Sequence, residues 1–432
     1  MALPALLLSA AALAGVGATV DPAAEVVAWT VDAGTSAALV EDHRAPTITV
    51  RIEFPAGKYS PWVRAHHAVE AFEHQDDDPA RALKKRADAL AAEVSLEVDD
   101  RAATIEGTCL SADLDALLAL MKDVLTNRDY DEKELRRAGR EQSIEWKGND
   151  TNVSFRMHQS VARAMFRDAD DPRRLRWEKP PSVETGAAAL AEARDALVRI
   201  PGRVVGFAGD LTRAQAERAM VGLLPPVDPR APEGLTPRFG PLVGAAERPK
   251  DTPIRIRKLT QVYFALGRDS LPWDDPRRPA YLVANHVLGG HFYSRLYVAL
   301  RHEGGETYGA GTREEGDVAP GLYAAATFTR APNAKTTETK LRGVLDVFHA
   351  QGITEEERKA AIGYLTGSRA FGRQSPEQIL ECYLVERRLG LPPGKIDADV
   401  DRAAALSLDE INRFIDDFYD PAQFTMVRAV AE

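Results

Sequence analysis

The chain has 432 residues, more than one hydrophobic core usually serves, which predicts about two to four domains. Its composition, 44% hydrophobic and 28% charged residues, is typical of a water-soluble globular protein. The formal net charge of −10, with no basic stripe, excludes nucleic acid as the expected partner. Two cysteines, Cys109 and Cys382, are too few for a disulfide framework, although one bridge between them stays open.

The N-terminus reads as a secretory signal. Residues 2–20 are an apolar run too short and too rich in Ala and Gly for a membrane span, and Val16-Gly17-Ala18 is typical of a cleavage site. The first Lys or Arg is Arg44, so the expected basic region is missing. We predict a signal peptide at residues 1–20, a periplasmic or secreted location, and no membrane span after signal removal, because no later segment is long and apolar enough.

Two strands are expected next, at residues 25–30 and 47–54. In the second, Ile48, Val50, Ile52 and Phe54 alternate with polar residues, as in a strand with one buried face. After a helix at 66–74, the expected order up to residue 223 is a helix at 80–92, strands at 94–98 and 103–107, helices at 114–121, 131–147, 153–166 and 187–198, a strand at 203–208 and a helix at 212–223.

The expected helix at 66–74, HHAVEAFEH, is dense in possible metal ligands. Positions four apart share one helix face, so Glu70 and His74 point the same way, with Glu73 beside them. The pattern is one residue away from His-x-x-Glu-His, in which two histidines bind zinc and the glutamate activates its water. Glu70 stands in place of the first histidine, and a carboxylate there weakens the activation of water.

Three interpretations of this helix stay open. Glu70, His74 and a distant acid could hold a divalent ion, with weaker binding than a two-histidine site. A second trio, His66, Glu70 and His74, also lines up on one face. The third interpretation needs no metal and treats the helix as a polar face with solvated charges.

A proline-dense stretch, residues 225–253, is expected to link two halves, at 21–224 and 254–432. Strand and helix patterns of the first half recur in the second, which predicts an α+β fold of two duplicated halves, each a mainly antiparallel sheet covered by helices on one side. The second half is expected to contain strands at 254–258, 262–266, 323–329 and 424–430, and helices at 279–288, 335–351, 354–370, 376–389 and 408–415.

Several stretches resemble the pitrilysin/insulinase family of zinc metallopeptidases, in the compact two-domain group that contains mitochondrial processing peptidase subunits. Ala56-Gly57 precedes Glu70 by the family's interval. The segments 288–296, LGGHFYSRL, and 300–308, LRHEGGETY, resemble the family's second-half segment. The resemblance covers about residues 25–432. It implies the catalytic base at Glu73 and the second zinc histidine at His74.

The resemblance also implies a third zinc ligand, a glutamate on the helix that begins at Asp131. Glu145 is the candidate, with Glu141 second, and a register counted from Phe155 puts Gln142 there instead. The degenerate metal site would then be Glu70, His74 and Glu145. We expect it to bind zinc weakly or not at all.

Arg301 and Tyr308 match the family's second-half Arg/Tyr pair, which is implied to hold the substrate backbone. A guanidinium and a phenol are donors able to stabilise a carbonyl oxygen as it gains charge. Gly304-Gly305 between them is expected to break the helix and turn Tyr308 back towards Arg301. No ligand spacing relates the remaining histidines, His43, His158, His286, His291, His302 and His349.

An intact Arg/Tyr pair in a chain with a degenerate zinc helix predicts a non-catalytic, substrate-binding subunit of an exported heterodimeric zinc peptidase. Its expected partners are a catalytic subunit with a complete His-x-x-Glu-His motif and an extended peptide. Two alternatives stay open. One is a self-sufficient zinc endopeptidase that uses Glu70, His74 and Glu145, and the other is a structural protein with the peptidase fold and no proteolytic role.

Overall fold

The computed structural model describes residues 25–73, 84–179, 186–230 and 232–432, apart from the side chains at 134, 138, 142 and 145. The predicted signal peptide and part of the predicted helix at 80–92 lie outside these ranges, although residues 84–89 are helical. By contact, the chain divides into two compact units. Unit 1 comprises Met1–Glu141, Ser182–Pro237 and Arg369–Gly394, and unit 2 comprises Gln142–Pro181, Arg238–Ser368 and Lys395–Glu432.

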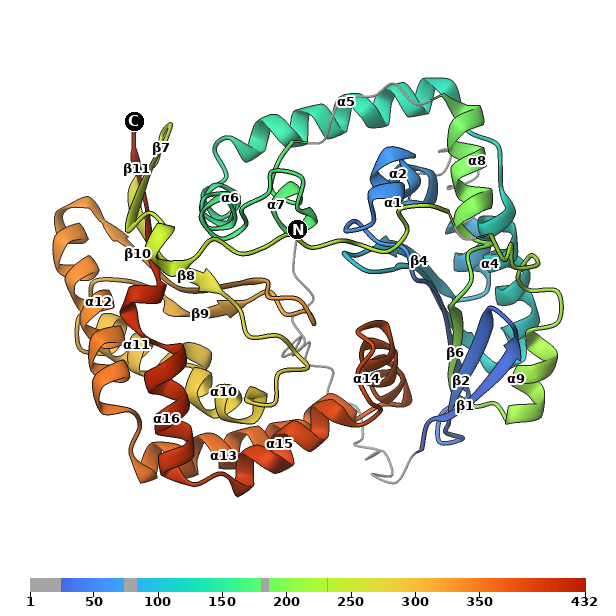
Figure 1. The fold of residues 1–432 in the computed structure, drawn as a ribbon. Helices are drawn as coiled ribbons and strands as arrows, with labels where there is room; N and C mark the ends of the chain where they lie inside the picture. The colour runs from blue at the N-terminus through green and yellow to red at the C-terminus, as the bar shows by residue number, and fades with distance from the viewer. Residues whose placement is uncertain (1–24, 74–83, 180–185, 231) are drawn as a thin grey trace. The chain divides into compact units, whose positions relative to one another are not determined.

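Unit 1 is built on a sheet of six described strands in the order β1-β2-β6-β3-β5-β4 (Figure 1). Strands β2 and β6 run parallel, and the other pairs are antiparallel. The strands are β1 (Val27–Asp32), β2 (Thr35–Glu41), β3 (Thr47–Phe54), β4 (Glu93–Val98), β5 (Ala103–Leu110) and β6 (Arg203–Gly209). The helices of this part are α1 (Pro61–Ala65), α2 (Ala68–Glu73), α4 (Leu114–Thr126), α5 (Glu132–Asn149), which continues into unit 2, α8 (Ala187–Leu197), α9 (Arg213–Ala219) and α14 (Pro376–Arg388).

Unit 2 is built on a sheet of five described strands in the order β7-β11-β8-β10-β9. Strands β7 and β11 run parallel, and the other pairs are antiparallel. The strands are β7 (Asp251–Ile256), β8 (Gln261–Asp269), β9 (Ala310–Glu314), β10 (Leu322–Arg330) and β11 (Thr425–Ala431). The helices are α6 (Val153–Met165), α7 (Pro172–Leu175), α10 (Arg278–Asn285), α11 (Arg295–Tyr297), α12 (Ala334–Gln351), α13 (Glu355–Arg369), α15 (Lys395–Ala405) and α16 (Leu408–Phe418).

The two sheets share one topology. Without β1, the strands of unit 1 lie in the order first, fifth, second, fourth, third along the chain, and the strands of unit 2 lie in the same order. In both sheets the first and fifth strands form the parallel pair. The predicted α+β class, with two duplicated and mainly antiparallel sheets covered by helices, is confirmed.

One face of each sheet packs on helices of the same half of the sequence. In β3, Ile48, Val50, Ile52 and Phe54 are buried in a core with α4 and α8, as their alternation predicts. In unit 2, the corresponding face packs on α10, α12 and α16. These two cores are the layers that the sequence pattern predicts.

The second face of each sheet carries a helix from the other half of the sequence, which the sequence analysis did not foresee. Helix α14 packs Leu380 and Leu384 on β2 and β6 of unit 1. Its approach is close because Gly206 lacks a side chain, and a Cβ there would lie 2.9 Å from Leu380 Cδ2. In unit 2, α6 packs Met157 and Val161 on β8 and β11.

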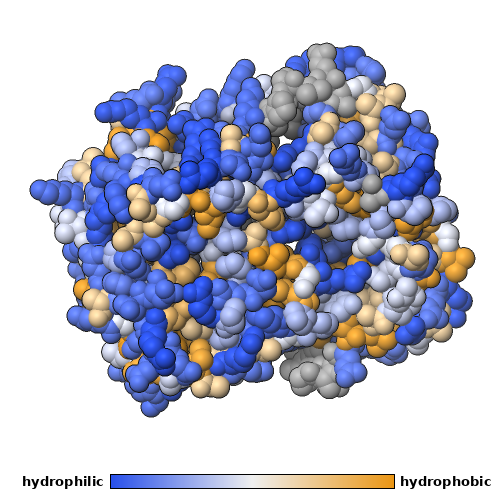
Figure 2. Space-filling model, viewed as in Figure 1, coloured by the Kyte–Doolittle hydropathy of each residue, from blue (hydrophilic) through white to orange (hydrophobic). Residues whose placement is uncertain are grey.

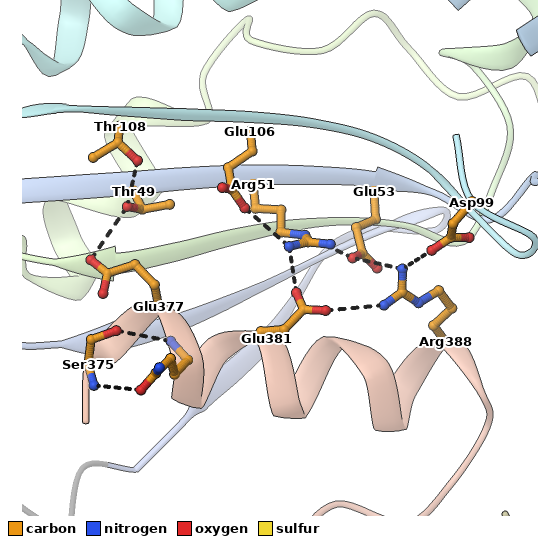
Figure 3. Close-up of polar contacts among 11 residues, drawn as sticks. Thr49, Arg51, Glu53, Asp99, Glu106, Thr108, Ser375, Glu377, Glu381 and Arg388 are labelled. Carbon is orange, nitrogen blue, oxygen red and sulfur yellow. Dashed lines mark hydrogen bonds and ion pairs between the residues drawn. The ribbon is translucent and has the colours of Figure 1, made fainter. Parts of the chain in front are cut away.

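The polar residues of β3 face α14 and are paired there (Figure 3). Glu53 has only 6% of its side chain exposed and receives a hydrogen bond from Arg51 Nε at 3.1 Å. Arg51 also pairs with Glu381 of α14, at 2.5 Å. Arg388, at the end of α14, lies 2.6 Å from Asp99, 3.4 Å from Glu381 and 3.7 Å from Glu53. This charge network joins α14 to β3 and to Asp99, the residue that follows β4.

The outer surface is mostly polar on the face shown in Figure 2, with hydrophobic residues in small groups. In the described part of the chain, no helix is long and apolar enough to cross a membrane. Cys109 is buried in β5 and Cys382 lies in α14, and neither forms a disulfide, so the bridge that the sequence left open is not made.

Candidate functional site

The segment predicted to bind zinc begins with a short helix, α1. Its first turn is fixed by Ser60, whose Oγ accepts a hydrogen bond from Val63 N–H at 3.3 Å, and by Pro61 at the first helical position. Trp62 and Val63 are buried in the core of unit 1. The helix is therefore anchored at its start, five residues before the first candidate ligand.

A break at His66 and His67 separates α1 from α2. Nδ1 of His66 donates a hydrogen bond to a carbonyl of α1 at 2.9 Å, and His67 takes a left-handed backbone conformation with φ of +51°. The prediction of one continuous helix is wrong here, because α2 begins only at Ala68. The alternative trio of His66, Glu70 and His74 on one helix face is wrong for the same reason.

The carboxylate of Glu73, the candidate catalytic base, is engaged by the backbone. Its Oε1 accepts a hydrogen bond from Val98 N–H, at the end of β4, at 2.9 Å. Glu70 Oε2 lies 3.7 Å from Nδ1 of His67. His74 and the side chain of Glu145 lie outside the described residues, so their roles stay predictions.

Of the candidate third ligands, Glu141 is the one whose side chain lies within the described residues. Glu141, the second candidate for the third ligand, is exposed and accepts a hydrogen bond from Arg137 Nε at 3.0 Å, while the side chain of Gln142 is outside the description. Over residues 25–73, 84–179, 186–230 and 232–432, no group of three or more His, Cys, Asp or Glu side chains could hold a metal ion. A carboxylate at position 70 also makes a poorer zinc centre than an imidazole.

Arg301 and Tyr308 lie in contact, as their spacing around two glycines predicts. Arg301 Cζ is 4.2 Å from the centroid of the Tyr308 ring, a cation–π geometry. Arg301 lies in a π-helical turn, Val298–His302, and its Nη1 donates to the carbonyl of Thr307 at 3.4 Å. Tyr308 is 77% exposed, so a ligand can reach its ring.

The glycines between them close the turn. Gly305 has φ of +64°, a conformation that a side chain disfavours, and its N–H donates to the carbonyl of Arg301 at 3.2 Å. A Cβ on Gly304 would lie 2.7 Å from the carbonyl oxygen of Ala299. The tight turn therefore depends on both glycines, and it brings Tyr308 back over Arg301.

The loop that carries Tyr308 is tied to strand β10 and helix α12. Thr329 Oγ1 donates to the carbonyl of Glu306 at 2.6 Å, and Lys340 Nζ lies 2.6 Å from Glu306 Oε1. Thr327 Oγ1 donates to the carbonyl of Gly309 at 3.0 Å. These bonds fix the loop on both sides of the tyrosine, so the pair is preorganised.

The pair offers hydrogen-bond donors in a polar, exposed setting. A guanidinium carries five N–H groups and a phenol one O–H, and both can donate to a peptide carbonyl. Tyr308 is followed by β9, which pairs only with β10 among the described strands and so lies at a sheet edge. An edge strand presents unpaired backbone groups, which can bind an extended peptide.

Two groupings escaped the sequence reasoning. His286 and His291 have ring centroids 4.0 Å apart, although their spacing gives no helical ligand pattern. A π-helical turn explains this, since it brings residues five apart into register, and the Gly-Gly pair between them was the available signal. The charges of α14 were visible in the sequence, but nothing there showed which strand they face.

The fold has two sheets of one topology, and the contact of Arg301 with Tyr308 lies in the second half of the chain. Residues 202–365 match the family described as Peptidase M16 inactive domain. An uncharacterized zinc protease of Streptomyces coelicolor is 33% identical over 146 residues, which are 34% of this chain and 31% of that protein. The matched part of the chain thus resembles the M16 peptidases, in agreement with the resemblance to the pitrilysin/insulinase family in the sequence.

Solved structures share the fold. A peptidase M16 inactive domain from Pseudomonas fluorescens aligns with a TM-score of 0.77 at 19% identity, covering 94% of this chain and 99% of that one. A protease from Helicobacter pylori has the same TM-score and coverage at 12% identity. The periplasmic protease PqqL from Escherichia coli aligns with a TM-score of 0.74 at 14% identity over all of this chain, which spans 49% of that protein. This chain thus has the M16 inactive-domain fold.

Proposed function

We propose that this chain is a non-catalytic, substrate-binding subunit of an exported heterodimeric zinc peptidase. The observation that carries the proposal is the Arg301–Tyr308 contact, held on a braced loop, in a chain whose zinc helix has Glu70 in place of a histidine. The degenerate zinc helix argues against water activation by the chain itself.

The partner in this proposal is a catalytic M16 subunit with a complete His-x-x-Glu-His motif, and the ligand is an extended peptide. Arg301 and Tyr308 would donate hydrogen bonds to a peptide carbonyl, and the edge strand β9 would pair with the peptide backbone. Export to the periplasm is supported by the apolar residues 2–20. We expect zinc to be bound loosely or not at all at Glu70, His74 and Glu145.

Reconstitution tests the proposal. The purified chain alone is expected to cleave no peptide, and activity is expected to appear when a catalytic subunit is added. Replacing Arg301 with Ala, or Tyr308 with Phe, should lower kcat/KM of the complex by about 100-fold, the range for one lost transition-state donor. Arg330→Ala is the matched control, because Arg330 is an exposed arginine on the same sheet.

Two results would replace the proposal with the alternatives. Chelator-sensitive cleavage by the lone chain, with one zinc per molecule lost in His74→Ala, would establish a self-sufficient peptidase. Full activity of the reconstituted Arg301→Ala complex would favour a structural protein with no role in peptide binding.

A further inference from the structure

Two imidazoles of unit 2 meet at a π-helical turn. His286 begins the turn His286–Gly290 and His291 follows it directly. Their ring centroids are 4.0 Å apart, with 53° between the planes. Gly289 allows the turn to lie close to β9, because a Cβ there would be 2.6 Å from the backbone nitrogen of Thr312. π-helical turns are rare and occur frequently at functional sites.

The pair is held in place by packing against an aromatic ring. His286 is 6% exposed and stacks on Tyr364 of α13, with ring centroids 4.5 Å apart. Nδ1 of His291 is buried and has no hydrogen-bond partner within the described ranges. A buried nitrogen without a partner is unfavourable, and a bound water or metal ion would satisfy it.

The chemical state of the rings suits a metal ion. Imidazole binds metals in its neutral form, and a histidine with the ordinary pKa of about 6.5 is already mostly neutral near pH 7.5. Neutral imidazole ligands suit copper, nickel and zinc, whereas magnesium and calcium prefer oxygen donors.

We propose that His286 and His291 form a two-imidazole site for a divalent transition-metal ion, with water completing the coordination. The site is separate from the degenerate zinc helix and does not depend on the proposed peptidase role. Copper(II) is expected to bind more tightly than zinc(II), following the general order of divalent affinities. The bound ion would join the two ends of the π-helical turn.

The test uses the untagged full-length protein, stripped with a chelator and titrated with copper(II) by calorimetry. Electron paramagnetic resonance then counts the nitrogen ligands. One equivalent of copper with two nitrogen ligands is expected, and His291→Ala should retain at most one of these nitrogens. Because loss of even an outer partner of a metal ligand costs about 10–100-fold in affinity, His291→Ala should weaken binding by about 100-fold or more.

Two controls identify the site. His302→Ala removes an exposed histidine of the next π-helical turn, and His74→Ala removes the histidine of the degenerate zinc helix; both should leave this binding unchanged. Copper that stays equally tight in His291→Ala, or that disappears in His74→Ala, would overturn the assignment, as would the absence of micromolar binding. Since a variant can misfold, hydrogen exchange of the parent protein gives a second measurement. Zinc(II) should slow exchange at residues 286–293, and no change there would also overturn it.

Discussion

Arg388 at the end of α14 gives the sharpest test of how unit 1 is held together. Its side chain is 12% exposed and lies within 4 Å of three carboxylates, those of Asp99, Glu381 and Glu53. Replacing it with Met keeps the volume of the aliphatic stem but removes the charge. Glu53 and Glu381 would then share a single cation, Arg51, in a buried setting.

The expected cost follows from this geometry. Removing one partner of a buried ion pair costs about 3–5 kcal/mol, because the remaining charge stays buried and uncompensated. Arg51 still neutralises part of that charge, and Asp99, at 38% exposure, can turn to water. We therefore expect Arg388→Met to lower the free energy of unfolding of unit 1 by about 2–4 kcal/mol.

Urea unfolding, with hydrogen exchange of residues 376–388 as a local probe, measures this effect. The matched control is Arg136→Met, which breaks an exposed helical pair with Glu132 and should cost about 0.3–0.5 kcal/mol. A second variant, with Met at both 381 and 388, should recover part of the loss, since it removes a buried charge with its partner. If Arg388→Met costs no more than Arg136→Met, the network does not hold α14 in place.

Three further predictions concern single residues. Gly305→Ala should lower the free energy of unfolding by about 1–2 kcal/mol, because φ of +64° is unfavourable for a residue with a side chain, although the Cβ has room. Urea unfolding measures this change in stability, and an unchanged midpoint would contradict the reasoning. Burial is the main cause that lowers the pKa of His158 below the ordinary 6.5, so the folded state is favoured above pH 6.5 and loses that advantage as the pH falls. His158→Phe should therefore flatten the decline in stability between pH 6.5 and 5. An identical pH profile would refute this. Burial raises the pKa of the Cys109 thiol to about 11, so iodoacetamide at pH 7.5 should label Cys109 about 100-fold more slowly than in the urea-unfolded chain. Mass spectrometry can follow the labelling. Equal rates would show that the thiol is accessible and that its pKa is not raised.

The sequence predicts the layers of this fold well and its backbone irregularities poorly. The alternation of Ile48, Val50, Ile52 and Phe54 identifies a buried strand face, because a period of two leaves little choice. The polar side of the same strand reads as solvent-facing, yet Thr49 and Glu53 are only 4% and 5% exposed under α14. Only tertiary structure shows that a helix more than 300 residues away in the chain supplies the partners of these groups.

The candidate site, too, could be predicted from the sequence only in part. The contact of Arg301 with Tyr308 follows from two glycines, whose conformational freedom is readable in the sequence. The break at His67 is not readable, because a left-handed histidine has no local signal comparable to a glycine. The contact of His286 with His291 is missed for a related reason, since π-helical turns have no periodic pattern.

Each half of the sequence supplies one helix to the sheet of the other half, α6 to unit 2 and α14 to unit 1, and this limits how the protein can be divided. Cutting the gene or the polypeptide within residues 225–253 would give two fragments, each without one of its own sheet-covering helices and carrying the helix that the other requires. The N-terminal fragment would leave Glu53 without Arg388, one of its two cations, and the C-terminal fragment would expose the apolar residues of β8 and β11 that pack on α6. The fragments should therefore be recovered only when they are produced together.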